Sequence, residues 1–199
     1  MAKIRIALFA SGKGSNAMNL IRHFAVSASA EVAFVLSNKA DAGILKSAAS
    51  KGIETLVFTN EEVADGEFLV NVCKKYSIDL IVLAGYLRLI PVHLIQAFPE
   101  RIINIHPALL PKYGGKNMYG DKVHQAIVDA NETETGITIH FVNEQFDKGK
   151  IIAQYVCPVH PTDSIDDVRE NVQHLEHTFF PFVVEKVIKE LKFAPRRAR

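Results

Sequence analysis

Short apolar runs alternate with amphipathic segments through the first half of the chain. These runs are continuous instead of alternating with polar residues, which indicates strands that are buried on both faces of a parallel sheet. The amphipathic segments between them show helical spacing. The predicted strands are Ile4–Ala10, Val32–Leu36, Thr55–Phe58, Leu80–Leu83 and Arg101–Ile105. The predicted helices are Asn16–His23 with caps at Ser15/Asn16, Asp41–Ser50, Glu61–Tyr76 and a short helix that begins near Pro91.

The second half of the chain has a different pattern. Two further strands, Gly136–Val142 and Ile151–Val156, are close enough in sequence to pair as an antiparallel hairpin with a long loop. A long helical region follows and extends to about Leu191, and Pro181 inside it predicts a break or a bend. Its predicted cap is Asp163 or Ser164. The sequence therefore predicts an α/β fold with a doubly wound mixed sheet, parallel in its N-terminal half and antiparallel in its C-terminal half.

Composition and charge narrow the class of partner. Lys and Arg number 23 against 22 Asp and Glu, so the net charge of +1 gives no field that would attract nucleic acid or a membrane surface. No apolar stretch approaches the roughly 20 residues needed to span a bilayer. The two cysteines, Cys73 and Cys157, are far apart in sequence, which is typical of a reducing compartment. We therefore expect a cytoplasmic protein with small-molecule partners, no nucleic acid and no membrane.

A glycine-rich segment, Ser11–Asn16, lies between the first predicted strand and the first predicted helix. Exposed backbone amides at a helix start favour an anion. A Walker loop does not fit, because Gly14 follows Lys13 and Ala7 stands where the first glycine should be. Two alternatives stay open at this point, a phosphomonoester and a dinucleotide phosphate.

The dinucleotide alternative depends on Gly12, Gly14 and Ala17, which spell the G-x-G-x-x-A fingerprint. The acidic residue that usually binds the ribose is missing from the end of the second strand. Asn38 and Lys39 stand there and could accept a ribose 2′-phosphate, which keeps an NADP-dependent oxidoreductase among the candidates.

A second motif, Asn104–Pro111, contains more specific information. Asn104 and His106 are two residues apart at the end of a predicted strand, so their side chains share a face of the sheet. The carboxyl ends of strands are where α/β folds place their ligands. Asp147 follows in the loop of the predicted hairpin.

With these segments the chain resembles the folate-dependent phosphoribosylglycinamide formyltransferases. The resemblance covers nearly the whole chain in the family's order, and its most specific part is the Asn-x-His-Pro-x-Leu-Leu-Pro segment with a later Asp. The matching segments are Ser11–Asn16, Ala84–Arg88, Asn104–Pro111, Gly136–Asp147 and Gln173–His177.

The resemblance implies transfer of a formyl group from 10-formyltetrahydrofolate to the amine of 5′-phosphoribosylglycinamide in de novo purine biosynthesis, through a tetrahedral intermediate and without a metal. A related deformylase that releases formate is the alternative inside the same class. The length of 199 residues favours one domain over residues 1–199, and we expect a monomer or homodimer. Its substrate-nucleotide half spans about residues 1–100, its folate and catalytic half about 101–191, and its tail 192–199.

Roles for individual residues follow from the same resemblance. Asn104 is expected to donate to the formyl oxygen and His106 to act as second donor and general acid, while Asp147 orients His106 and raises its pKa. Residues for the phosphorylated substrate are expected to be Gly14, Ser15, Asn16, Gln173 and Glu176. The residues expected to bind the folate are Leu87, Arg88, Leu89, Ile90, Asn104, Asn143, Glu144, Gln145, Phe146 and Asp147.

Two segments depart from the family pattern. Lys112–Lys122 is longer than in the commonest members, and its three glycines and two tyrosines suggest an ordered but mobile lid over the folate entrance. Asn60–Phe68 contains no Arg that could meet the glutamate tail of the folate.

Overall fold

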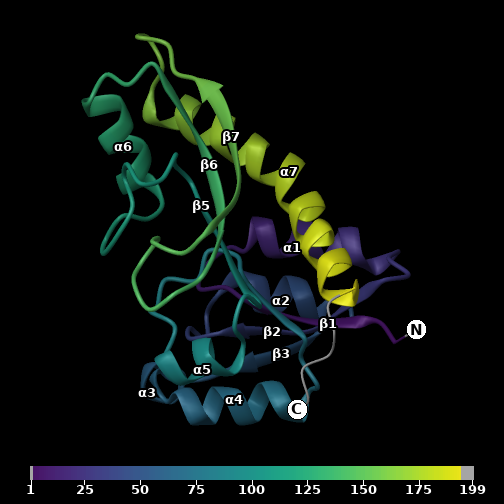
Figure 1. Ribbon diagram of the computed structural model, residues 1–199. Helices are drawn as coiled ribbons and strands as arrows, with labels where there is room; N and C mark the ends of the chain where they lie inside the picture. The colour runs from purple at the N-terminus through teal and green to yellow at the C-terminus, as the bar shows by residue number, and fades with distance from the viewer. Residues whose placement is uncertain (1, 194–199) are drawn as a thin grey trace.

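The structure, a computed structural model, describes residues 2–193, and its centre is one seven-stranded sheet in the order β3-β2-β1-β4-β5-β6-β7 (Figure 1). The first five strands of the chain pair in parallel, whereas β6 pairs antiparallel with β5 and with β7. The predicted mixed α/β sheet is therefore confirmed. The strands are β1 (Ile4–Phe9), β2 (Ala30–Ser37), β3 (Glu54–Val57), β4 (Leu80–Leu83), β5 (Ile102–His106), β6 (Glu134–Phe141) and β7 (Ile151–Pro158).

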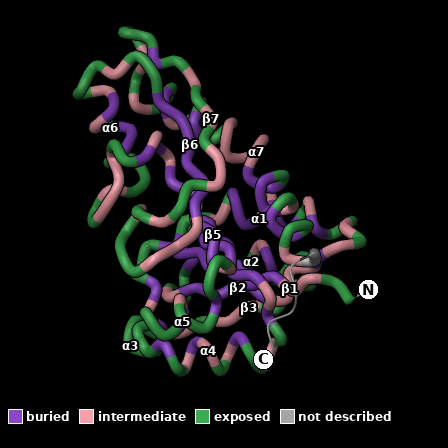
Figure 2. Tube along the Cα trace, viewed as in Figure 1, coloured by how far each residue is buried: buried purple, intermediate pink, exposed green. Residues whose placement is uncertain are grey.

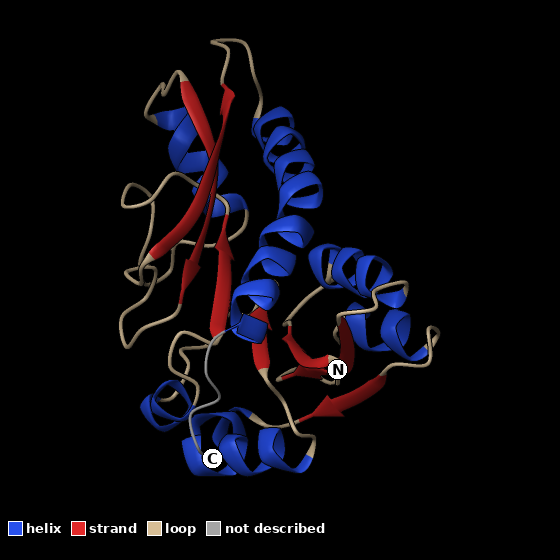
Figure 3. Ribbon diagram, turned by 45° about the vertical axis from the view of Figure 1, so that its right-hand side comes forward, coloured by secondary structure: helices blue, strands red, loops and turns tan. Residues whose placement is uncertain are grey.

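Two apolar clusters, one on each face of the sheet, explain why the parallel strands are continuously apolar. In β1, Ile6 and Leu8 belong to one cluster, and Ala7 and Phe9 belong to the other. Helices cover both faces, so the buried residues concentrate along the strands (Figures 2 and 3). The helices are α1 (Ser15–Ala25), α2 (Gly43–Ala49), α3 (Asn60–Ala64), α4 (Gly66–Lys75), α5 (Val92–Ala97), α6 (Asp121–Asp129) and α7 (Ile165–Phe193).

The single helix predicted over Glu61–Tyr76 is two helices, because Asp65 interrupts it. Asp65 has an extended backbone, with φ −79° and ψ 103°, and its carboxylate accepts a hydrogen bond from the N–H of Phe68 at 3.0 Å. Aspartate favours this capping role over a place inside a helix. The preceding helix α3 has its own start signal, a capping box between Thr59 and Glu62.

The sequence pattern did not predict helix α6. It is a nine-residue helix whose buried residues are Val123, His124 and Ile127. Two of these are the only aliphatic residues it buries, which leaves a weak periodic signal after a glycine-rich segment. The helix nevertheless packs against α7 and closes one end of the first apolar cluster.

Helix α7 continues through Pro181, so of the predicted break or bend the structure shows a bend. Proline has no N–H, and the carbonyl four residues earlier, that of His177, loses its helical donor. The side-chain amide of Asn19 in α1 donates to that carbonyl at 2.7 Å and replaces the missing bond. The helix changes direction part-way along its length (Figure 3), as expected for an internal proline. The predicted tail falls largely on residues 194–199, which lie outside the described residues.

The strand order places a crevice at one point of the sheet. From β1 the chain proceeds outward to β2 and β3, then crosses back to β4 on the other side of β1. The segments after the carboxyl ends of β1 and β4 therefore diverge, and this is the place where open α/β sheets bind ligands. Over residues 2–193 no helix combines the length and the apolar character that a membrane crossing requires.

Candidate active site

A cavity of about 1050 Å³ opens at the carboxyl ends of the parallel strands. Its volume matches the upper part of the usual range for small-molecule sites. Four loop segments line it, together with Asn16 from the start of α1 and Glu176 from α7. The segments are residues 85–92 after β4, 104–107 at the end of β5, 115–120 before α6 and 142–147 between β6 and β7.

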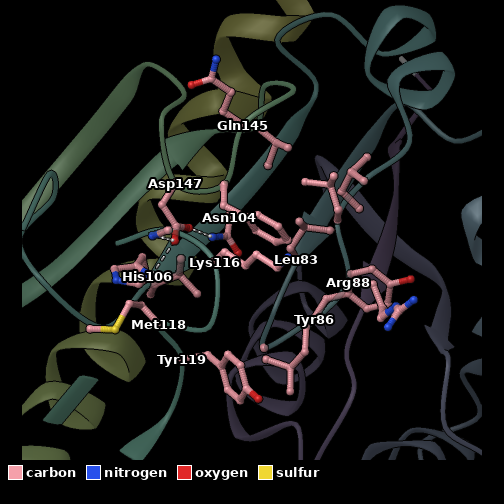
Figure 4. Close-up of a pocket in the computed structure, with 18 of the residues that line it drawn as sticks. Leu83, Tyr86, Arg88, Asn104, His106, Lys116, Met118, Tyr119, Gln145 and Asp147 are labelled. Atoms are coloured by element: carbon pink, nitrogen blue, oxygen red, sulfur yellow. Dashed lines mark hydrogen bonds and ion pairs between the residues drawn. The ribbon is translucent and has the colours of Figure 1, made fainter. Parts of the chain in front are cut away.

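The three predicted catalytic side chains lie together on one wall of this cavity (Figure 4). Nδ2 of Asn104 lies 3.4 Å from Oδ1 of Asp147, and Nδ1 of His106 lies 3.5 Å from Oδ2 of the same carboxylate. Asn104 and His106 come from β5, whereas Asp147 reaches them from the β6–β7 loop, with a backbone φ of 55°. The structure therefore brings together the amide, the imidazole and the carboxylate that the motif predicted.

His140 is a fourth member of the cluster that sequence reasoning missed. It lies opposite Asn104 in the β5–β6 pairing, and its Nε2 is 3.1 Å from Nδ2 of Asn104. Its other nitrogen, Nδ1, contacts the carbonyl of Phe141 at 2.8 Å. A neutral ring with its proton on Nδ1 can donate to that carbonyl and accept from Asn104 through Nε2. His140 thus fixes which end of the Asn104 side chain presents its N–H groups to the cavity.

The two N–H groups of the Asn104 amide are not held equally. One is directed to Nε2 of His140 at 3.1 Å, within ordinary hydrogen-bond range. The contact with Asp147 is longer, 3.4 Å, and is correspondingly weak. An oxygen atom that enters the cavity beside Asn104 can therefore take this second N–H at little cost.

His106 lies between two acceptors. Its Nε2 is 2.8 Å from the backbone carbonyl of Tyr113, and its Nδ1 faces the Asp147 carboxylate. Both acceptors are satisfied only when both ring nitrogens carry a proton. Burial nevertheless lowers the pKa of His106 and outweighs Asp147 and the Tyr113 carbonyl, which raise it, while His140 lowers it further. The predicted effect of Asp147, which raises the pKa of His106 by its opposite charge, is therefore confirmed, but burial makes the net direction downward.

Asp147 remains ionised in this setting. Burial raises the pKa of its carboxyl, but the neighbouring His140 and His106 rings and the N–H of Gly115 lower it, and the net direction is down. The N–H of Gly115 donates to Oδ2 at 2.9 Å. The same carboxylate therefore organises the imidazole and the loop that precedes α6.

The residues predicted for the phosphorylated substrate form a second cluster, which lies between the start of α1 and the middle of α7. Nδ2 of Asn16 donates to Oε2 of Glu176 at 2.8 Å, and Nε2 of Gln173 donates to the Ser15 hydroxyl at 3.3 Å. The helix cap is Gly14, with φ 74° and no side-chain cap bond, so the predicted Ser15/Asn16 cap is wrong. Of the five residues, Asn16 and Glu176 line the cavity; Gly14, Ser15 and Gln173 lie beside it.

Asn16 and Glu176 are unusual in their burial. Oδ1 of Asn16 is buried and makes no hydrogen bond, which leaves an acceptor next to the cavity for a ligand donor. Burial raises the pKa of Glu176 to about 6, against the hydrogen bond from Asn16, which lowers it. The carboxyl therefore changes its charge near neutral pH.

The residues predicted to bind the folate line the same cavity. Leu87, Leu89 and Phe146 expose 36–48% of their surface there, which leaves apolar area for a flat ring system. The residues of the predicted set that line the cavity are Leu87, Arg88, Leu89, Ile90, Asn104, Asn143, Glu144, Gln145, Phe146 and Asp147. Sequence reasoning missed several other lining residues, namely Asn60, Val63, Tyr86, Met118, His124 and Val142.

The dinucleotide alternative loses support from the position of Asn38. Its carbonyl oxygen accepts from the Ser11 hydroxyl at 2.7 Å, and its amide nitrogen donates to Asn60 at 3.0 Å. Ser11 in turn accepts from the N–H of Leu87 at 3.1 Å. Asn38 therefore braces the loops around the cavity instead of presenting its side chain to a ribose phosphate. In the described part of the chain, no group of three or more His, Cys, Asp or Glu is placed to hold a metal ion.

Comparisons with known proteins agree with this geometry. The sequence pattern of the formyl transferase family matches residues 4–184. The chain therefore belongs to the formyl transferase family. This formyl transferase is 44% identical over 192 residues to the chloroplastic phosphoribosylglycinamide formyltransferase of Arabidopsis thaliana, covering 94% of this chain and 66% of the relative. It is 38% identical over 190 residues to the phosphoribosylglycinamide formyltransferase of Haemophilus influenzae, covering 91% and 85%.

Solved structures show the same relationship. The phosphoribosylglycinamide formyltransferase of Brucella melitensis superposes with a TM-score of 0.84 at 33% identity, over the whole of both chains. The glycinamide ribonucleotide transformylase 1 of Symbiobacterium toebii superposes with a TM-score of 0.85 at 31% identity, over 94% of this formyl transferase and 89% of the other chain. The formyl transferase spans just under two thirds of the Arabidopsis relative's length and most of the other three chains.

Proposed function

We propose that this formyl transferase moves the formyl group of 10-formyltetrahydrofolate to the amine of 5′-phosphoribosylglycinamide, a step of de novo purine biosynthesis. The observation that supports this most is the group of Asn104, His106 and Asp147 on a cavity that also reaches Asn16 and Glu176. One end thus offers donors for an acyl oxygen. The other offers a helix start and a carboxyl, which suit a phosphate and ribose hydroxyls.

The chemistry that these residues support is an addition followed by an elimination. The amine nitrogen forms a bond to the formyl carbon, and the carbonyl oxygen takes up negative charge beside Asn104 and His106. The bond from that carbon to the folate nitrogen then breaks, and the proton lost by the amine is returned to the departing nitrogen. Donors aimed at the developing oxyanion and a proton shuttle are the two contributions that this reaction needs.

An absorbance assay of 10-formyltetrahydrofolate, run with and without the ribonucleotide, tests the proposal. We expect loss of the formyl folate that depends on the ribonucleotide and yields the formylated product in equal amount. Formate release at the same rate without the ribonucleotide would instead identify a deformylase. Nicotinamide-dependent absorbance changes would favour the oxidoreductase alternative.

Replacing Asp147 by asparagine tests the role of the carboxylate. The charge of Asp147 raises the pKa of His106 against its burial, so the variant's imidazole loses its proton at lower pH. If catalysis needs protonated His106, the alkaline limb of the pH–rate profile moves to lower pH, and the loss relative to wild type is greatest on the alkaline side. A profile of unchanged shape, measured as kcat from pH 5.5 to 9, would contradict this role.

Replacing Glu176 by glutamine tests the ribonucleotide end. We expect the KM for the ribonucleotide to rise about tenfold, as for loss of a hydrogen bond to a charged group, with little change in kcat. In the wild type this KM should fall as pH rises through about 6, because the ionised carboxylate is the better acceptor. The glutamine variant should lose that dependence, and the exposed variant Glu170→Gln on the same helix serves as control.

We propose that the protein acts in the cytoplasm as a monomer or homodimer, without nucleic acid; the Arabidopsis relative, by its name, is chloroplastic. We also propose that Gly14, Ser15 and Asn16 bind the phosphate, with Gln173 nearby, and that residues 112–122 close over the folate end.

A further inference from the structure

One hydrogen-bond partner of His106, the backbone carbonyl of Tyr113, belongs to a loop and not to the sheet. The loop starts at the cis peptide Leu110–Pro111 and runs to Gly120, before α6 begins. Tyr113 has a positive φ of 55°, a conformation that costs a non-glycine residue free energy and persists only where neighbouring contacts hold it. Its carbonyl lies 2.8 Å from Nε2 of His106.

Contacts outside the cavity hold this residue in place. The Tyr113 hydroxyl donates to Oε1 of Glu132 at 2.8 Å. Nζ of Lys112 reaches the same oxygen at 2.8 Å. Glu132 exposes only 23% of its side chain, whereas Lys112 exposes 68%. The Tyr113 contact is therefore the better shielded of the two and the stronger structural restraint.

The next two residues of the loop, Gly114 and Gly115, are held by contacts on the cavity side. The chain at Gly114 passes close to the side chains of Leu110 and Asp147, and a Cβ there would overlap Cδ2 of Leu110. The N–H of Gly115 is fixed on Asp147. The loop is thus fastened at Glu132 on one side and at Asp147 on the other, with the Tyr113 carbonyl between these two points.

We propose that Tyr113 and Glu132 are a positioning pair, in which Glu132 holds the Tyr113 backbone so that its carbonyl orients His106 with Nδ1 toward Asp147 and the reacting group. The pair contacts neither substrate nor the reacting atoms and acts through His106. Neither residue lines the cavity. The inference rests on the proposed formyl transfer and extends it to a residue pair outside the cavity.

The other charged and titratable groups near His106 define the background against which this contact acts. Asp147 faces it from the β6–β7 loop, His140 from β6, and His124 from α6 interacts with it electrostatically. The Tyr113 carbonyl and Asp147 favour the protonated ring; burial and His140 oppose it. A loosened Tyr113 backbone therefore shifts the titration of His106 to lower pH, while the three ionisable neighbours stay unchanged.

Tyr113→Phe is the primary test, since it removes the hydroxyl and keeps the ring and the carbonyl. We expect kcat to fall about tenfold, the effect of losing roughly one hydrogen bond to a charged group, with less than about twofold change in either KM. The alkaline limb of the profile and the midpoint of the His106 ring titration, followed by NMR without substrate, should both move to lower pH.

Glu132 supplies matched variants. Glu132→Ala should reproduce Tyr113→Phe, and the double variant should be no worse than either single one, because both remove the same contact. Glu132→Gln keeps an oxygen that accepts from the hydroxyl and should stay close to wild type. Lys189→Gln, which removes an exposed ion pair with Glu185 on α7, is the control with unchanged kcat.

The outcomes separate this inference from the proposed function. If the wild type transfers formyl but Tyr113→Phe loses only thermal stability, with the pH profile and the His106 titration unmoved, the pair is merely structural and the inference is wrong. If the wild type transfers no formyl, the proposed function fails. A lowered His106 titration in Tyr113→Phe still supports the positioning in that case.

Discussion

Replacing His106 by alanine is expected to lower kcat by about 10²–10⁴-fold, the usual contribution of general acid–base catalysis. The imidazole is 3% exposed and lies between Tyr113 and Asp147, so water cannot readily take its place in the same orientation. Single-turnover formation of the formylated ribonucleotide measures the chemical step directly and separates it from product release.

Two comparisons make that result specific. His160→Ala, at an exposed histidine after β7, should leave kcat unchanged. A thermal melt shows whether the His106 variant keeps its fold. Activity within tenfold of wild type in a folded His106→Ala protein would remove the imidazole from the mechanism.

Replacing Asn104 by alanine is expected to lower kcat by about 10²–10³-fold, as for loss of one oxyanion donor. The reason is that one N–H of Asn104 is held only by the long contact with Asp147 and is free to meet charge that develops in the transition state. Because such a donor acts mainly in the transition state, the KM of each substrate should change little.

A matched substitution separates this effect from general damage. Asn171→Ala, at an exposed position of α7, should leave the rate unchanged. Steady-state assays over both substrates give kcat and KM for each variant. A rise in KM with kcat preserved would assign Asn104 to ground-state binding and contradict the proposed oxyanion role.

The sheet could be predicted from the sequence because each buried strand has a continuous apolar run bounded by polar turns. All seven predicted strands are present within a few residues of the expected ends. The elements that were predicted wrongly or not at all depend on local interactions. Asp65 could cap a helix or lie inside one, and only its extended backbone shows which. In α6, two aliphatic positions were too few to reveal the period.

The candidate site shows a similar division. Asn104, His106 and Asp147 could be predicted because a specific motif includes them. His140 could not, since its place opposite Asn104 depends on the register of two strands joined by a long connection. The role of the Tyr113 carbonyl could not be predicted from the sequence, because every residue has a backbone carbonyl. The raising effect of Asp147 on the pKa of His106 could be predicted, but the net direction could not, since the sequence shows charges but not burial.

The internal proline of α7 has a consequence for variation far from the substrates. The amide that compensates Pro181 belongs to Asn19, one turn along the helix that begins with Ser15 and Asn16. A substitution at either Asn19 or Pro181 therefore alters how α1 and α7, the two helices proposed to bind the ribonucleotide, are joined, even though neither side chain borders the cavity. In a set of natural or engineered variants, substitutions at Asn19 and at Pro181 should therefore occur together and not separately.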